Sequence, residues 1–437
     1  KYQKDISLRT NTMGCHVQLF RLPEEVIADN IFCYLDLKSL VRVSQTCKRL
    51  RNCAYTDGNW KILCQRYWLL TERERSTWRE DFIAWYIDLG RYMYVYGPIR
   101  RLWDRILGCV RIKSPAIYET LNGPPATEQA LDDIEYRLQR PLPKELRCSY
   151  RICNGQNLKT SHSRETEYGL LGMLIANNYS VCEVLLSAEG ILRNLSQENK
   201  RRNAVHFTNR FIYPPGLHST CNGKPGFSMR VCLKDNGDVR IGNVCIQMDE
   251  TDAVVPTFVY ASNFTEWLEQ LACRLESKAL MVNEGKISQF NSSSEGPLEM
   301  KKVKLDVATV LIPEFSSLVK SNAKLMHAYQ ITMSMADGIL PKYCCTLETR
   351  QLEITEHDAE SNQRTQEVQG EGVIAGERPT LKPGTKFTFA SWTPLTAIEG
   401  FMTGNFKFKS NFDQRCFSVP CPKFEFRCPQ IKNFKFD

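Results

Sequence analysis

The stretch QGEGVIAGERPTLKPG, residues 369–384, decides the class of the C-terminal fold. Its glycines could cradle a phosphate, as in a nucleotide enzyme, or they could let two strands turn. A dinucleotide site needs a strand before the glycines and a helix after them, so that the pyrophosphate meets the positive helix end. Here Arg378-Pro379 and Lys382-Pro383-Gly384 follow, which break helices and make turns, and no G-K-[ST] closes a Walker loop. The stretch therefore predicts turns between strands.

The residues around this stretch have the two-residue period of β-strands, with apolar side chains at alternate positions. The alternating pairs are Ile331 and Met333, Leu352 and Ile354, Phe387 and Phe389, Phe406 and Phe408, and Phe424 and Phe426. Because successive side chains of a strand point to opposite faces, each strand would bury one face and expose the other to solvent. We expect an all-β, immunoglobulin-like sandwich over residues 303–430.

The N-terminal segment, residues 18–65, has the period of short amphipathic helices. Pro23 suits a first helical turn, and Asp36 suits the cap of a second helix. Roughly three or four helices of this length cannot bury all of their apolar faces on one another, since such small domains remove little surface from water. Part of that surface is therefore expected to meet a partner.

This segment resembles the F-box, a helical motif that docks onto the Skp adaptor of Skp, cullin and F-box (SCF) ubiquitin ligases. The resemblance rests on apolar residues in the order and spacing of the motif, and it implies that they contact the adaptor. The residues are Leu22, Pro23, Ile27, Ile31, Leu35, Leu37, Leu40 and Val43. We expect Trp60 in the core instead. Burying four or five such side chains would contribute about 6–12 kcal/mol before the costs of association.

The middle of the chain is expected to be a helical linker, residues 66–109, followed by a mixed α/β (α+β) domain, residues 110–276. The domain resembles the SUKH family. The matching motifs are Glu135, Leu142-Pro143, Asn154-Gly155 and Gly169-Leu170-Leu171-Gly172. Residues 277–302 contain GKISQFNSSSEGP and lose apolar periodicity, so we expect a flexible linker there.

The predicted sandwich resembles the ApaG domain, on the motifs Y-Q-I-T-M-S from Tyr329, L-K-P-G from Leu381 and G-F-M-T-G from Gly400. We expect target proteins at its glycine loops, with the SUKH domain as the rival surface. The glycines are Gly370, Gly372, Gly376, Gly384, Gly400 and Gly404. An extra Ala375 departs from the family's G-x-G-V-V-G loop. Ligand, nucleotide or pyrophosphate binding there stays open as an alternative, because an amide nest is geometrically possible.

Residue counts and net charge argue against several other classes of protein. The 18 cysteines lack C-x-x-C pairs and the six histidines stand apart, so we predict reduced thiols and no metal, cofactor or catalytic residues. No run of about 18 apolar residues and no signal peptide is seen, and we expect a cytoplasmic or nuclear protein without a membrane partner. The net charge of +8 is mild. The basic, aromatic region from Arg73 to Lys113 is interpreted as an amphipathic connector, so nucleic acid is not an expected partner.

The order F-box, SUKH, ApaG resembles a family of F-box proteins that combine the three domains. The resemblance implies a non-catalytic substrate receptor of an SCF-type ubiquitin ligase. It would bind the Skp adaptor and, through it, the cullin and RING subunits, and would promote ubiquitination and proteasomal degradation of a target. Such a receptor contributes proximity, while other subunits supply the transfer chemistry. The sequence predicts neither the target and its degron nor the oligomeric state.

Overall fold

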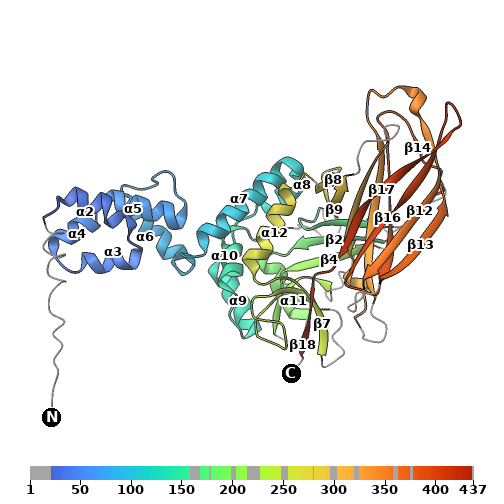
Figure 1. The fold of residues 1–437 in the computed structure, drawn as a ribbon. Helices are drawn as coiled ribbons and strands as arrows, with labels where there is room; N and C mark the ends of the chain where they lie inside the picture. The colour runs from blue at the N-terminus through green and yellow to red at the C-terminus, as the bar shows by residue number, and fades with distance from the viewer. Residues whose placement is uncertain are drawn as a thin grey trace, which may run out of the picture. The chain divides into compact units, whose positions relative to one another are not determined.

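The chain forms two compact units, residues 1–101 and residues 102–437, with helices first and most strands later (Figure 1). The structure is a computed structural model. It describes residues 21–157, 168–176, 179–197, 203–213, 227–247, 254–278, 280–295, 303–318, 324–357, 363–374 and 377–435. The predicted multidomain order of a helical N-terminal region, a central α/β region and a C-terminal β domain is confirmed.

The described elements of the first unit are all helices, joined by loops. Its elements are α2 (Glu24–Asn30), η1 (Phe32–Tyr34), α3 (Leu37–Ser44), α4 (Lys48–Ala54), α5 (Asp57–Leu63), η2 (Cys64–Trp68), α6 (Trp78–Leu89) and η3 (Gly90–Tyr92). Asp36 caps α3 as predicted, because its carboxylate accepts a hydrogen bond of 2.7 Å from the Ser39 amide. Trp60 lies in the core as predicted, and its ring centroid is 5.4 Å from that of Phe82. Since Phe82 belongs to α6, this core continues beyond residue 65.

The second unit begins with helices and an antiparallel sheet. The helices are α7 (Tyr96–Lys113), which starts in the first unit, α8 (Pro115–Leu121), α9 (Glu128–Leu138), α10 (Lys144–Ile152), α11 (Ala188–Gln197) and α12 (Phe264–Glu276). The sheet has the order β18-β7-β6-β5-β3, and its strands are β3 (Ala204–His206), β5 (Arg230–Cys232), β6 (Val244–Gln247), β7 (Val254–Ala261) and β18 (Gln430–Lys435). The last described strand, β18, therefore returns to pair with the central region.

An eight-stranded sheet joins the central region to the C-terminal region. Its main path is β15-β11-β10-β9-β1-β2-β4, and β8 pairs with β9. The strands are β1 (Gly172–Ala176), β2 (Tyr179–Leu185), β4 (Thr208–Tyr213), β8 (Leu280–Asn283), β9 (Lys286–Glu295), β10 (Val303–Leu311), β11 (Leu325–Met335) and β15 (Lys386–Leu395). Strand β9 connects the two halves, because it pairs in parallel with β1 and antiparallel with β10.

The expectation of a flexible linker over residues 277–302 is corrected by these strands. Residues 280–283 and 286–295 form β8 and β9, whereas residues 279 and 296–302 lie outside the described residues. Residues 291–295 pair with β10, and the backbone hydrogen bonds of such a pair need no apolar side chains. The polar run N-S-S-S-E at residues 291–295 can therefore form a strand without a hydrophobic period.

The C-terminal region is the predicted sandwich. A second sheet, of order β13-β12-β16-β17 with β14 beside β12, faces strands β10, β11 and β15. Its strands are β12 (Cys345–His357), β13 (Gln363–Glu371), β14 (Thr380–Leu381), β16 (Glu399–Ser410) and β17 (Cys416–Arg427), and short turns η6 (Pro313–Phe315) and η7 (Pro341–Tyr343) lie between strands. Ile331, Leu352, Phe406 and Phe424 of the alternating pattern are all in the shared core.

His327 on β11 is expected to make the sandwich less stable in acid. Neither ring nitrogen has a hydrogen-bond partner among the described residues, and burial lowers the pKa of His327 to about 4. The unfolded chain binds a proton at about pH 6.5 and the folded chain only near pH 4, so stability is lost as pH falls through this window, by up to about 3 kcal/mol. We expect His327→Phe to flatten the fall of Tm between these pH values. An unchanged slope in calorimetric melts would contradict this assignment.

Candidate functional site

The predicted adaptor-binding residues are split between the core and the surface of the first unit. Ile27 and Leu40 are enclosed within the chain, at 0% and 1% exposure, which corrects the expectation that they contact a partner. The helical period turns Ile27 inward, where α2 packs against α4 and α5. The others keep accessible surface: Pro23 is exposed, and Leu22, Ile31, Leu35, Leu37 and Val43 are half-buried.

The chain also exposes apolar groups here that were not predicted as contacts. Tyr34 is 80% exposed and Val41 39% exposed. The turn that carries Tyr34 is fixed by Arg66, whose guanidinium donates to the carbonyls of Cys33 at 2.9 Å and Leu35 at 3.0 Å. We call the set of Leu22, Pro23, Ile31, Tyr34, Leu35, Leu37, Val41 and Val43 the F-box face. Its apolar groups are thus presented on a backbone that is already ordered.

The predicted target-binding glycines do not form one site. Gly370 lies in β13 with Gly372 just after it, and Gly384 lies in the turn before β15. Gly400 and Gly404 lie inside β16, which corrects their placement in a loop. Gly376 lies outside the described residues.

The pairing with β12 shows how far apart these glycines are. The Gly372 amide donates to the carbonyl of Glu348, whereas Gly400 pairs with Glu356. Eight residues of strand separate these partners, which is roughly 26 Å at 3.3 Å per residue. Gly372 and Gly400 therefore cannot hold one ligand together, whereas Gly404 pairs with Leu352, only four residues from Glu348.

The backbone amides of the glycine stretch are already used within the fold. Gly372 donates to Glu348, Ile374 and Glu377 donate to each other's carbonyls, and Gly384 donates to Met335. A phosphate cradle needs such amides free to point at the ligand. The described amides therefore do not favour the nucleotide or pyrophosphate alternative.

The structure explains why two of these positions, 384 and 372, are occupied by glycine. Gly384 has φ +75°, and the Thr385 amide donates to Lys382 across it, so Pro383-Gly384 forms a turn that requires positive φ. At Gly372 a Cβ would clash with the carbonyl of Leu347. The prediction that glycine permits turns thus holds at Gly384, while Gly372 permits close approach of two strands.

Exposed apolar side chains occur at the end of the sandwich that carries β14. Leu340, Val373 and Phe412 are 56%, 37% and 76% exposed. They stand on three loops that leave the same end, because Cys345 pairs with Ser410 and Thr349 pairs with Glu371. We call these three side chains the apolar tip. Sequence reasoning missed it, since its members are 33 and 39 residues apart along the chain.

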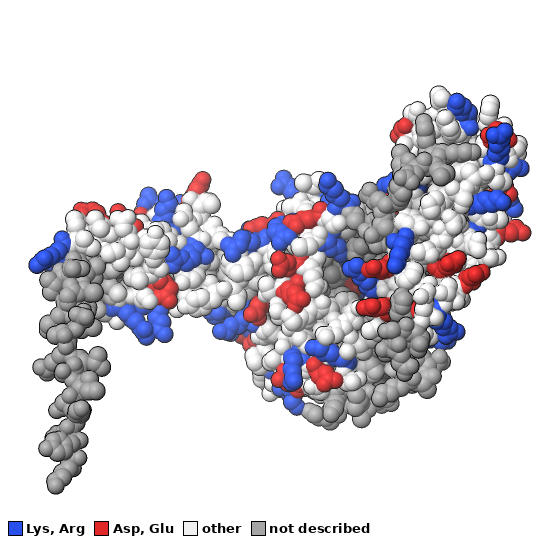
Figure 2. Space-filling model, viewed as in Figure 1, with Lys and Arg blue, Asp and Glu red and all other residues white. Residues whose placement is uncertain are grey.

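The basic connector has internal partners in the second unit. Arg105 forms a two-pronged ion pair with Glu276, at 2.7 and 2.6 Å. Figure 2 shows Lys and Arg interspersed with Asp and Glu over the visible face rather than gathered in one basic stripe. This distribution does not resemble a nucleic-acid footprint.

No described helix is both long and apolar enough to cross a membrane. Within the same residues, no group of three or more His, Cys, Asp and Glu side chains could hold a metal ion.

Comparison with protein families matches three regions of the chain. An F-box-like model matches residues 19–66, the SMI1/KNR4 family (SUKH-1) matches residues 125–270, and the ApaG domain matches residues 316–410. Protein ApaG of Bradyrhizobium diazoefficiens is 34% identical over 132 residues, which are 30% of this chain and 92% of that protein. Through its C-terminal domain the chain belongs to the ApaG family.

Two longer relatives extend over nearly the whole chain. F-box only protein 3 of Rattus norvegicus is 27% identical over 407 residues, 92% of this chain and 80% of that protein. F-box protein SKIP16 of Arabidopsis thaliana is 24% identical over 414 residues, 85% of this chain and 89% of that protein. The chain is thus similar to F-box only protein 3, with F-box-like, SUKH and ApaG domains in one polypeptide, as the sequence predicted.

Proposed function

We propose that the chain is the substrate-recognition subunit of an SCF-type ubiquitin ligase and binds an Skp adaptor through the F-box face. The observation that carries the proposal is an F-box-like region whose ordered helices leave Pro23, Tyr34 and Val41 exposed and five further apolar side chains half-buried. Similarity to F-box only protein 3 supports the same role. Cullin and RING subunits would join through the adaptor.

Co-purification with a recombinant Skp adaptor tests this proposal. We expect the full chain to elute with the adaptor as a stable complex of one copy each. Circular dichroism before mixing confirms that the chain is folded. A folded chain that elutes without the adaptor would overturn the assignment.

The apolar tip is the surface that we propose for target proteins. Exposed apolar groups gathered on loops of a rigid sandwich are typical of protein-binding surfaces. The glycines Gly370, Gly372 and Gly384 shape the loops at this same end. Gly400 and Gly404, inside β16, are not part of this surface.

A matched pair of variants tests the apolar tip. In cells that lack the endogenous chain, Leu340→Ser with Phe412→Ser should fail to restore the ubiquitinated proteins that depend on the wild type. Ile398→Ser is the control, because Ile398 is 59% exposed and lies beside Glu399, which pairs with His357 at the opposite end of β12. Full restoration by the double variant would place target binding elsewhere, with the SUKH domain as the next surface to test.

The receptor itself would be non-catalytic, with ubiquitin transfer and target degradation carried out by other components. We place it in the reducing cytoplasm or nucleus. The cysteines support this placement, because they are scattered along the chain without the density of a disulfide framework.

A further inference from the structure

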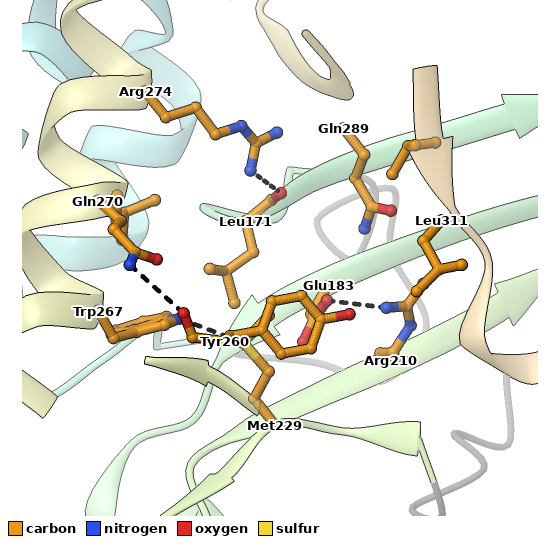
Figure 3. A pocket seen from close by; sticks show the side chains of 12 residues that line it. Leu171, Glu183, Arg210, Met229, Tyr260, Trp267, Gln270, Arg274, Gln289 and Leu311 are labelled. Carbon is orange, nitrogen blue, oxygen red and sulfur yellow. Dashed lines mark hydrogen bonds and ion pairs between the residues drawn. The ribbon is translucent and has the colours of Figure 1, made fainter. Parts of the chain in front are cut away.

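A cavity of about 340 Å³ lies where α12, the SUKH strands and the start of the ApaG region meet (Figure 3). This volume is within the range of small-molecule sites. Met229, Trp267, Leu271 and Val310 supply apolar walls. Trp267 and Leu271 are one helical turn apart on α12, so one face of this helix forms a continuous side of the cavity.

Arg210 on β4 supplies a buried positive charge to the cavity. Its side chain is only 5% exposed and forms ion pairs with Glu183 at 3.2 Å and Glu314 at 2.6 Å. Its Nη2 has no hydrogen-bond partner among the described residues. A buried donor without an acceptor is costly, and a native site rarely keeps one without a reason.

Arg274 on α12 is a second cation at the same cavity (Figure 3). Its guanidinium donates to the carbonyls of Leu171 at 2.9 Å and Ser288 at 2.6 Å. Burial lowers the pKa of Arg274 to about 10, and the charge of Glu183 opposes this effect. The Glu183 carboxylate accepts from Thr208 as well as Arg210. The two arginines and the two carboxylates therefore balance in charge, and Nη2 of Arg210 remains a donor without an acceptor among the described residues.

We propose that the cavity binds a small monocarboxylate with an apolar body. The carboxylate would accept from Arg210, and the apolar body would pack on Trp267, Met229 and Leu271. Nη2 of the guanidinium can donate a charge-assisted hydrogen bond to one carboxylate oxygen, while the other guanidinium nitrogens stay with Glu183 and Glu314. A phosphate dianion is disfavoured by the nearby Glu183 and Glu314, and a cation is disfavoured by the two arginines. This site is separate from the F-box face and the apolar tip, so it does not depend on the proposed function.

Calorimetry with four matched probes tests the ligand class. The probes are 3-phenylpropionate, 3-phenylpropanol, 3-phenylpropylamine and 3-phenylpropylphosphonate, which share one apolar body and differ in charge. We expect the carboxylate to bind at least about tenfold more tightly than the other three, a difference of about 1.4 kcal/mol. Equal binding of the alcohol, preference for the amine or the phosphonate, or no binding of the carboxylate would each overturn the proposal.

Two variants locate the binding. Val310→Phe fills the cavity from a half-buried position and should abolish binding of 3-phenylpropionate. Arg210→Lys keeps the charge beside Glu183 and Glu314 but removes Nη2, and should weaken binding about tenfold or more. Val373→Phe, on the apolar tip, is the control that should bind like the wild type. Since Val310→Phe needs no change in the ion pairs, unchanged binding by this folded variant would by itself rule out the cavity.

Discussion

The double variant Ile31→Asp with Leu35→Asp is expected to lose Skp-adaptor binding by about 100-fold or more. Both side chains are half-buried in the free chain, so they can be accommodated as carboxylates while the adaptor is absent. An adaptor that covers them would have to bury two unpaired charges, at several kcal/mol in total. Surface plasmon resonance with immobilised adaptor measures the loss.

The control for this loss is Tyr136→Asp with Ile175→Asp. These apolar side chains are 77% and 54% exposed and belong to the second unit. The control removes the same kind of group and adds the same charge, so it should keep wild-type affinity. Equal affinity of the two double variants, with both folded, would show that the F-box face is not the adaptor site.

Arg210→Met is expected to destabilise the second unit by about 3–5 kcal/mol. The change removes the cation that Glu183 and Glu314 share. The side chains of both glutamates are at most 5% exposed, so two buried carboxylates would be left without an ion-pair partner. Burial already raises the pKa of Glu183, against the effect of Arg210. Differential scanning calorimetry should show the transition of this unit lowered by about 5 °C or more.

A surface ion pair provides the comparison for Arg210→Met. Arg240 lies 3.8 Å from Asp235, and both side chains are more than half exposed. Arg240→Met should therefore change stability by less than about 1 kcal/mol. If the two variants have the same Tm, the buried cluster of Glu183, Arg210 and Glu314 does not stabilise the packing of the central region against the C-terminal region.

Repeating patterns in the sequence predicted the elements that bury one face. The spacing of Ile27 and Ile31 predicted α2, Asp36 predicted the start of α3, and the Phe406 and Phe408 pair predicted β16. The same spacing did not tell which apolar residues stay accessible. Ile27 and Leu40 fit the F-box pattern as well as Leu35 does, and only the packing of α2, α4 and α5 separates core from surface.

Features that depend on distant partners were not predictable in this way. Strand β9 is polar over its second half and pairs there with its neighbour β10. The Glu183, Arg210 and Glu314 cluster joins residues 27 and 104 positions apart. One signal was present, because Glu183 interrupts the apolar run V-C-E-V-L-L at residues 181–186. A charge at such a position indicates a buried ion pair, although not its partner.

Hydrogen exchange of the full chain, with and without a saturating Skp adaptor, tests the central claim most directly. The account predicts that exchange slows by about tenfold or more in the segment of residues 22–43, because a bound partner suppresses local opening of the helices it covers. The second unit should exchange at the same rate in both samples. Unchanged exchange at residues 22–43 in a verified complex, or protection confined to the second unit, would contradict the claim that the adaptor binds the F-box face.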